Sequence, residues 1–122
     1  MILADTVVWI DYLRGSDPSM RGLLAAGQIA MHPCIVAELA LRSLHNRKKT
    51  LATLDALATV KIARLGEIRR MIESHMLYSR GIGLTDAHLM ASCLLSPGTK
   101  LWTRDAALHR VAVSLGIDAQ LP

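Results

Sequence analysis

The sequence predicts an α/β fold with a central parallel sheet of about four to five short strands, flanked by helices. Two observations favour this fold. Short apolar runs suited to buried strands recur along the chain, and longer helical segments separate these runs. Size is the third, since 122 residues suffice for one domain with a substantial core but not for two. We therefore expect a single domain over residues 1–122.

The predicted elements alternate along the chain. Strands are expected at residues 2–5, 28–31, 60–63, 101–103 and 118–121. Helices are expected at residues 7–13, 17–27, 33–44, 50–57, 67–79, 84–95 and 106–115. No internal repeat, linker or low-complexity tract interrupts the pattern.

End signals place the helices of the first half. The first helix follows its strand without a gap and stops near Gly15. Asp17 and Pro18 open the second helix, because proline fits a first helical turn, and Gly27 ends it. Pro33 opens the third helix directly after the second strand.

Periodicity places the helices of the second half. A stripe recurs at helical spacing within residues 67–79, formed by Ile68, Met71, Ile72, His75 and Met76. Residues 84–95 are apolar nearly all round, which predicts a buried helix. Pro97-Gly98 then turns the chain into the fourth strand, and Gly116 ends the last helix.

Composition excludes several classes of protein. A chain that is 52% hydrophobic and 20% charged is not disordered. Two Trp, two Tyr and no Phe leave little for a base-stacking surface of the kind that binds single strands. No apolar run approaches a membrane span, and no secretory signal is visible. Isolated Cys34 and Cys93 are typical of reduced core thiols. We expect a cytoplasmic protein with no membrane partner.

The charge is weakly informative. The net charge is +4, and basic residues are densest between Arg42 and Lys49. A basic surface suits a polyanionic partner, although such clusters are also common as simply solvated faces.

Four acidic residues, Asp5, Glu38, Asp86 and Asp105, each lie within an apolar segment or at its end. A carboxylate in such a place needs a structural partner, a cation or a neutralising proton. Asp5 ends the first strand and Asp105 follows the fourth, and parallel sheets bind ligands beyond these carboxyl ends. If folding brings the four together, their hard oxygen ligands favour Mg²⁺ or Mn²⁺.

Each acid also has a structural explanation. Asp5 and Asp105 could cap the helices that follow them, and Thr85 or Asp86 could cap the next-to-last helix. Glu38 could pair with Arg42 one turn later. Glu38 is the hardest to explain this way, because its neighbours in sequence are apolar.

Each polar or basic residue beside the acids has two possible roles. Thr6 and Thr103 could hydrogen-bond metal ligands, or could serve as local caps. Arg104 could contact a substrate phosphate, or lie exposed in solvent.

The histidines give a weaker signal. His32-x-Cys34 is a possible fragment of a zinc site, but no second pair stands at suitable spacing. His88 lies near Asp86 in sequence, and we expect it to be packed or at the surface. His75 is expected at the edge of the core.

Four segments carry the acids in order: Ile-Leu-Ala-Asp-Thr-Val-Val-Trp-Ile-Asp (2–11), Val36-Ala37-Glu38-Leu39, Leu84-Thr85-Asp86-Ala87 and Leu101-Trp102-Thr103-Arg104-Asp105. Taken together, they resemble the PIN-domain ribonucleases, particularly the VapC-type toxins of bacterial toxin–antitoxin pairs. The resemblance covers essentially the whole chain at family-like spacing. No single motif is specific, and the ordered set carries the likeness.

The resemblance implies a single PIN-like domain in which Asp5, Glu38, Asp86 and Asp105 bind Mg²⁺, or Mn²⁺ in its place, assisted by Thr103. It implies an endoribonuclease that hydrolyses RNA phosphodiester bonds with metal-activated water. It also implies a homodimer held inactive by a cognate antitoxin, whose C-terminal segment lies over the active-site groove.

Two other functions stay open on the sequence. One is a non-catalytic RNA- or protein-binding module with the same fold, and the other is a metal-dependent phosphohydrolase of small substrates. Leu108 departs from the Phe that many relatives carry after the last acid, and we expect it to be a packing residue.

Overall fold

The computed structural model describes residues 1–15 and 17–122. Its strands are β1 (Ile2–Ala4), β2 (Ile29–Met31), β3 (Ala58–Thr59) and β4 (Lys100–Trp102). Its helices are α1 (Thr6–Arg14), α2 (Pro18–Ala25), α3 (Pro33–Ala40), α4 (Arg47–Asp55), α5 (Leu65–Ser74), α6 (Leu84–Leu95) and α7 (Ala106–Ser114). The strands form one parallel sheet, so the predicted α/β class is confirmed.

The order of the strands places a reversal of topology beside β1. The sheet runs β3-β2-β1-β4, with Leu3 opposite Ala30 on one side and Leu101 on the other. The chain moves outward from β1 through β2 to β3, and then returns through α5 and α6 to β4. Ligands of such sheets bind where the order reverses, which here is between the carboxyl ends of β1 and β4.

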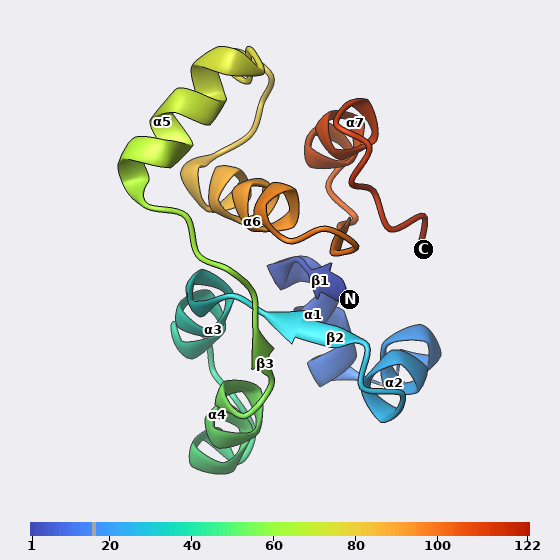
Figure 1. Ribbon diagram of the computed structural model, residues 1–122. Coiled ribbons are helices and arrows are strands. Elements are labelled where there is room, and N and C mark those ends of the chain that lie inside the picture. The colour runs from blue at the N-terminus through green and yellow to red at the C-terminus, as the bar shows by residue number, and fades with distance from the viewer. Residues whose placement is uncertain (16) are drawn as a thin grey trace.

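The helices cover the sheet in two groups. Figure 1 shows α5, α6 and α7 on one side of the strands, and α3 and α4 on the other. Helix α6 packs against both α5 and β4, whereas α3 packs against α1 and α4. The middle of α6 is buried, as its apolar sequence predicts, from Leu89 to Cys93. The buried strands and this helix therefore hold the strand ends in fixed positions.

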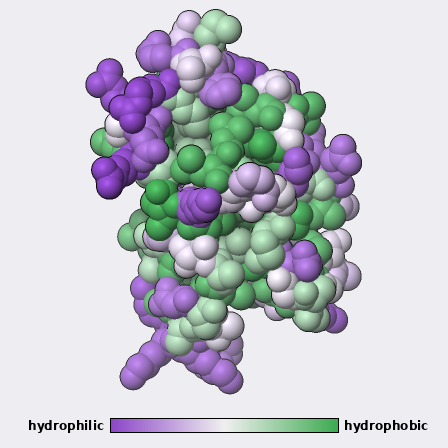
Figure 2. Space-filling view, in the orientation of Figure 1, coloured by the Kyte–Doolittle hydropathy of each residue, from purple (hydrophilic) through white to green (hydrophobic). Residues whose placement is uncertain are grey.

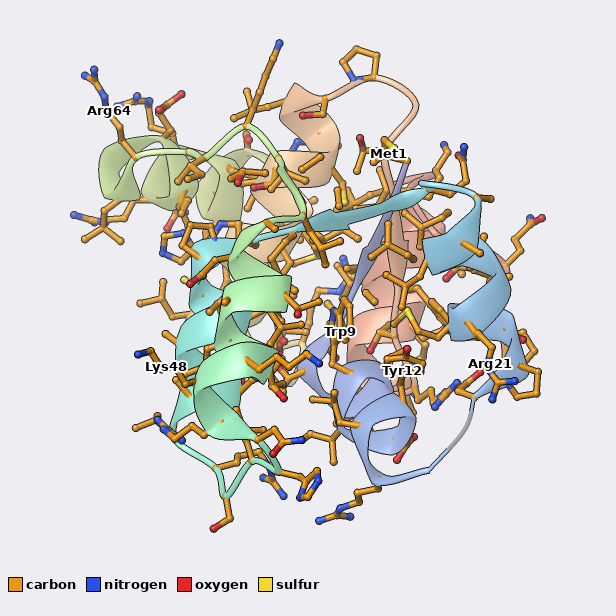
Figure 3. All side chains as sticks on the ribbon, turned by 90° about the horizontal axis from the view of Figure 1, so that it is seen from below. Met1, Trp9, Tyr12, Arg21, Lys48 and Arg64 are labelled. Atoms are coloured by element: carbon orange, nitrogen blue, oxygen red, sulfur yellow. The ribbon has the colours of Figure 1, made fainter. Side chains whose placement is uncertain are left out.

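The core is aliphatic, with two large aromatic side chains built into it. Trp9 and Trp102 are almost fully buried, and the Trp9 ring lies 5.9 Å from the ring of Tyr12. Figure 3 shows Trp9 inside the fold, while Lys48 and Arg64 lie at its periphery. Leu108 is fully buried, which confirms its packing role. Burial of one such side chain stabilises the fold by about 1.5–3 kcal/mol.

The surface is mixed in character. In Figure 2, apolar residues spread across the middle of the visible face, while hydrophilic residues gather over α5 and at the opposite end near α4. Among residues 1–15 and 17–122, no helix combines the length and apolar character that a membrane span requires.

Two strand predictions need correction. The third strand lies at Ala58–Thr59 and not at residues 60–63. Both of its residues are exposed, so no apolar pattern marks them, whereas Val60 and Ala63 are buried in the loop that follows. The expected strand at residues 118–121 is reduced to a single bridge between Leu101 and Asp118.

The boundary between α3 and α4 also differs from the prediction. Helix α3 ends at Ala40 and not near residue 44, and α4 begins at Arg47 and not at residue 50. The guanidinium of Arg47 donates hydrogen bonds to the carbonyls of Ala40 and Arg42, at 2.5 and 3.0 Å, which satisfies groups just beyond the end of α3. Asn46 adopts a left-handed conformation (φ 47°), which separates the two helices.

Helix α5 ends earlier than predicted, before the last two residues of the predicted apolar stripe. The helix stops at Ser74, and Met76 then adopts a left-handed conformation (φ 50°). The Leu77 N–H donates to the Ile72 carbonyl at 2.9 Å, and Leu77 is buried. His75 and Met76 are exposed, so the predicted place of His75 at the core edge and of Met76 on the apolar stripe is wrong. Leu77 completes the apolar contact after the turn.

Candidate functional site

Asp5 is the most deeply buried of the predicted site acids. Its side chain follows β1, and the residue is 7% exposed. Its Oδ1 accepts a hydrogen bond from the Thr6 N–H at 2.6 Å, and its Oδ2 accepts one from the Thr103 hydroxyl at 2.9 Å. The Asp5 N–H donates to the Trp102 carbonyl, which fixes β1 beside β4. Asp5 thus caps α1, as one reading of the sequence predicted, and is also tied to the end of β4.

Glu38 enters the same region from α3. The Thr6 hydroxyl donates to its Oε2 at 2.9 Å, so Thr6 connects the end of β1 to α3. Within the described residues, Glu38 makes no ion pair with Arg42, which excludes the predicted helical pair from this structure. Glu38 is half-buried, in agreement with its apolar sequence neighbours.

Asp86 and Asp105 lie at two helix N-termini. Asp86 accepts a hydrogen bond from the Gly83 N–H at 3.0 Å through its Oδ2, within the first turn of α6. Asp105 is the N-cap of α7, and its Oδ1 accepts from the Leu108 N–H at 2.8 Å. The Thr103 hydroxyl accepts from the Asp105 N–H at 3.1 Å. Each of these two acids uses one oxygen for capping, and this leaves the other available.

The charges of the four acids act on one another. Burial raises the pKa of Asp5, and the charges of Asp86 and Glu38 raise it further against the hydrogen bonds from Thr103 and Thr6. Burial also raises the pKa of Asp86, and the Asp105 and Glu38 charges add to this.

No lysine, arginine or histidine in the described residues forms an ion pair with any of the four. The structure therefore gathers mutually repelling carboxylates at the reversal point of the sheet without a protein counterion.

The gathered acids form an open group. Within the described part of the chain, Asp5, Glu38 and Asp86 do not offer three oxygens within 4.8 Å of one another. Mutual repulsion favours such spacing. The donor set still fits Mg²⁺ or Mn²⁺, because Mg²⁺ is bound through one or two carboxylates and keeps several of its waters. A cation here would be held by Asp5, Glu38, Asp86 and Asp105, with Thr6 and Thr103 orienting the ligands.

Arg104 corrects a prediction. Its side chain is 25% exposed and is not the free, solvent-exposed arginine expected from the sequence, because its guanidinium pairs with Asp11 and Asp17 at 2.6 Å each. The guanidinium carbon also lies 5.4 Å from the centre of the Trp102 ring. Arg104 joins the loop after β4 to α1 and to the start of α2. No feature of the sequence signals this pairing, since both partners are distant along the chain.

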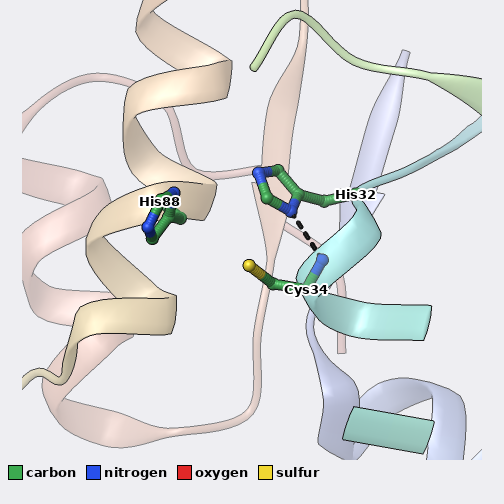
Figure 4. A group of neighbouring side chains, drawn as sticks. All are labelled: His32, Cys34 and His88. Atoms are coloured by element: carbon green, nitrogen blue, oxygen red, sulfur yellow. Dashed lines mark hydrogen bonds between the residues drawn. The ribbon is translucent and has the colours of Figure 1, made fainter. Parts of the chain in front are cut away.

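A second cluster was set aside on the sequence and is assembled by the fold. His32, Cys34 and His88 lie together between β2, α3 and α6 (Figure 4). The usual spacing of zinc ligands along a sequence does not reveal this cluster, because its third residue, His88, lies on a distant helix.

Comparison with known proteins identifies the family. The sequence matches the PIN domain over residues 2–114. The chain belongs to the PIN-domain family. This PIN domain is 37% identical over 117 residues to the protein named Ribonuclease VapC32 from one strain of Mycobacterium tuberculosis, covering 96% of this chain and 94% of the relative. The match to the protein of the same name from a second strain has the same identity and coverage.

The comparisons confirm the resemblance that was stated from the four acid-bearing segments. The matched range contains all four segments, and the similarity extends over almost the whole of both chains. This PIN domain is therefore of the VapC type.

Proposed function

We propose that this PIN domain is a Mg²⁺-dependent endoribonuclease, with Mn²⁺ able to replace Mg²⁺, and the toxin of a VapBC-type toxin–antitoxin system. The proposal is supported by the contacts of Asp5, because Thr103 and Thr6 link it to the segments that carry Asp105 and Glu38. The charges of Asp105 and Glu38 act on Asp86, and no ion pair to any of the four acids is found in the described residues. These acids lie near the reversal point of the sheet, where ligands of parallel sheets bind. The relatives named as ribonucleases support the same function.

The proposed roles of the residues follow from their contacts. Asp5, Glu38, Asp86 and Asp105 supply carboxylate oxygens to the cation, and Thr103 holds the Asp5 carboxylate in place. Thr6 holds Glu38 in the same way. A bound Mg²⁺ supplies Lewis-acid chemistry, namely a lowered pKa of water and neutralisation of charge on a phosphoryl oxygen. The fixed carboxylates orient the attack on the phosphodiester, and hydrolysis breaks one P–O bond as water adds across it.

RNA affinity is proposed to come from the basic surface. The net charge is +4, and Lys48 and Lys49 are exposed on α4. Contacts of such side chains with phosphates weaken as the salt concentration rises, because binding releases condensed counterions.

The antitoxin and a second copy of the chain are the proposed protein partners. Val7 and Leu84 each lie two residues from a proposed ligand, and they are 45% and 58% exposed. A partner protein that binds over the proposed ligands would cover these two apolar side chains. Expression of the toxin alone should arrest growth, and a neighbouring reading frame should rescue it; harmless expression would contradict the toxin role.

The test of the nuclease proposal is cleavage of defined RNA by purified protein. Cleavage should need Mg²⁺, stop in EDTA and return when Mg²⁺ is added in excess. Asp86→Asn should lower the rate by more than about 100-fold, because loss of an outer-shell partner alone costs 10–100-fold. Asp5→Asn should have the same effect. Circular dichroism should report an unchanged fold for both variants.

Asp55→Asn is the matched control, because Asp55 is an exposed acid at the end of α4, far along the chain from the proposed ligands. It should cleave at the wild-type rate. Equal cleavage by wild type and Asp86→Asn would mean that a contaminating nuclease is responsible, and would overturn the proposal. RNA binding that survives EDTA, without cleavage by the folded wild type, would identify a binding module instead.

A further inference from the structure

Three side chains with nitrogen and sulfur donors meet between β2, α3 and α6. His32 follows β2 and caps α3, Cys34 lies in the first turn of α3, and His88 lies on α6. One ligand atom from each, either a ring nitrogen or the sulfur, lies within 4.8 Å of the other two. Figure 4 shows His32 and Cys34 beside each other at the start of α3, with His88 opposite them on α6.

The two histidines bring buried nitrogen atoms without hydrogen-bond partners to this cluster. His32 is only 1% exposed, and its Nε2 has no hydrogen-bond partner in the described residues. The Nδ1 of His88 is also buried without a partner there. The two rings lie 5.8 Å apart, edge to face. Because buried polar atoms in folded proteins are nearly always paired, two orphaned nitrogens beside a thiol point to a ligand.

We propose that His32, Cys34 and His88 form a site for Zn²⁺ or a similar thiophilic divalent cation, distinct from the acid centre. Imidazole and thiolate are the ligands that Zn²⁺ prefers, whereas Mg²⁺ prefers oxygen. Three protein ligands leave the fourth tetrahedral position open. Tetrahedral ligands of zinc stand about 3.3–3.8 Å apart, so atoms that already lie within 4.8 Å of one another need only small side-chain movements to bind one ion.

The protonation states can be followed through binding. The Nδ1 of His32 accepts a hydrogen bond from the Cys34 N–H at 3.0 Å, so the proton of the neutral ring lies on Nε2. To bind metal through Nε2, the ring moves its proton to Nδ1 and gives up this cap. The ring stays neutral throughout, in keeping with burial and the neighbouring His88, which lower the pKa of His32.

Cys34 releases the one proton of the reaction. Burial and the charge of Glu38 raise the pKa of this thiol, so it is protonated at neutral pH. Metal binding replaces its proton with a metal–sulfur bond, and the proton leaves to solvent. The new charge of the thiolate is then neutralised by the cation.

The proposed zinc site shares its two helices with the acid centre. Cys34 lies one turn before Glu38 on α3, and His88 lies two residues after Asp86 on α6. A cation that joins α3 to α6 here fixes the spacing of the helices that carry two of the four acids. The binding itself does not depend on the proposed ribonuclease activity.

The experiment titrates the purified protein with Co²⁺ in excess Mg²⁺, which occupies the carboxylates. Wild type should bind one Co²⁺ per chain with a thiolate-to-cobalt charge-transfer band and release about one proton. Zn²⁺ should displace Co²⁺, abolish the band and raise the thermal midpoint. Cys34→Ser should abolish the band, and His88→Gln should weaken affinity by more than about 100-fold, since loss of an outer-shell partner alone costs 10–100-fold.

Cys93→Ala and His109→Gln are the matched controls, because one removes the other thiol and the other removes an exposed histidine. Both should keep the band and the affinity. Binding without a thiolate band, or a band that survives in Cys34→Ser, would overturn the proposal. If Asp86→Asn lost Co²⁺ binding while Cys34→Ser kept it, the cation would be bound by the carboxylates. That result would also overturn the proposal.

Discussion

Carboxylates gather at two places in the described part of this PIN domain, and only one of these two groups has a counterion among the described residues. After β4, Arg104 pairs with Asp11 and Asp17 at 2.6 Å each, and this lowers the pKa of Asp17. At the ends of β1 and β4, burial and mutual repulsion raise the pKa of Asp5 and Asp86. The two groups lie on adjacent segments, since Arg104 follows Thr103 directly.

The comparison separates a structural from a functional use of the same side chains. Where acids connect helices α1 and α2 to the loop after β4, Arg104 pairs with them and stabilises their ionised carboxylates. Where acids are proposed to bind a cation, hydroxyls and backbone N–H groups position them, and their charge is left for the ligand to neutralise. Changes to one group should therefore act on stability, and changes to the other on metal binding.

Among residues that position an acid without binding the cation themselves, the largest effect should come from Thr103, which positions Asp5. Thr103→Val removes the hydroxyl that donates to Asp5 and accepts from the Asp105 N–H. We expect Mg²⁺ affinity to fall by about 10–100-fold, measured by calorimetric titration, as for other outer-shell partners. Thr103→Ser keeps the hydroxyl and should stay within a few-fold of wild type. A valine variant with unchanged affinity would remove Thr103 from the proposed centre.

Arg104→Gln should have an intermediate effect, and on stability alone. It leaves Asp11 and Asp17 without their counterion, so the free energy of unfolding should fall by about 1–2 kcal/mol for the two partly exposed pairs. Urea denaturation measures this change. Arg110→Gln, at an exposed site on α7, is the control and should stay within about 0.5 kcal/mol. Loss of Mg²⁺ binding in Arg104→Gln with normal stability would contradict the division between the groups.

The smallest effects should have opposite signs. In EDTA at neutral pH, Asp86→Asn should raise the free energy of unfolding slightly, because burial and the charges of Asp105 and Glu38 disfavour the ionised carboxylate. Asp17→Asn should lower it by about 1 kcal/mol, although Asn keeps the cap on Ser19 and Met20.

The pH dependence of stability follows the same signs. The raised pKa of Asp86 means that the native state holds its proton at a higher pH than the unfolded chain does. Its contribution therefore falls as pH rises through the interval between the ordinary carboxyl value and the raised one. Asp17 behaves in reverse, because its stabilisation is present above the ordinary value and is lost as pH falls through its lowered pKa. Denaturation of wild type and of the two variants across acidic pH should reveal these opposite slopes as the difference in the free energy of unfolding between wild type and each variant.

Much of the fold could be predicted from local signals. The caps at Asp17 and Asp105 and the apolar sequence of α6 mark helices that the structure contains. β3 could not be predicted, because its two exposed residues carry no pattern. The end of α3 was missed because it is set by Arg47, a side chain beyond the helix.

The sites divide in the same way. The four acids could be named from their apolar settings and their order along the chain, and their binding of metal stays a prediction. The partners of Arg104 could not be named, because they lie 93 and 87 positions away. The meeting of His88 with His32 depends on how α6 packs beside the end of β2, which no local pattern specifies.

The hydrogen bond between Asp5 and Thr103 joins residues 98 positions apart. Because the bond needs β4 in place beside β1, a ribosome must complete most of the polypeptide before the centre can exist. On the proposed function, the growing chain would therefore lack a complete metal centre until β4 has been made. The acid centre can assemble only late, once synthesis of this polypeptide is nearly finished.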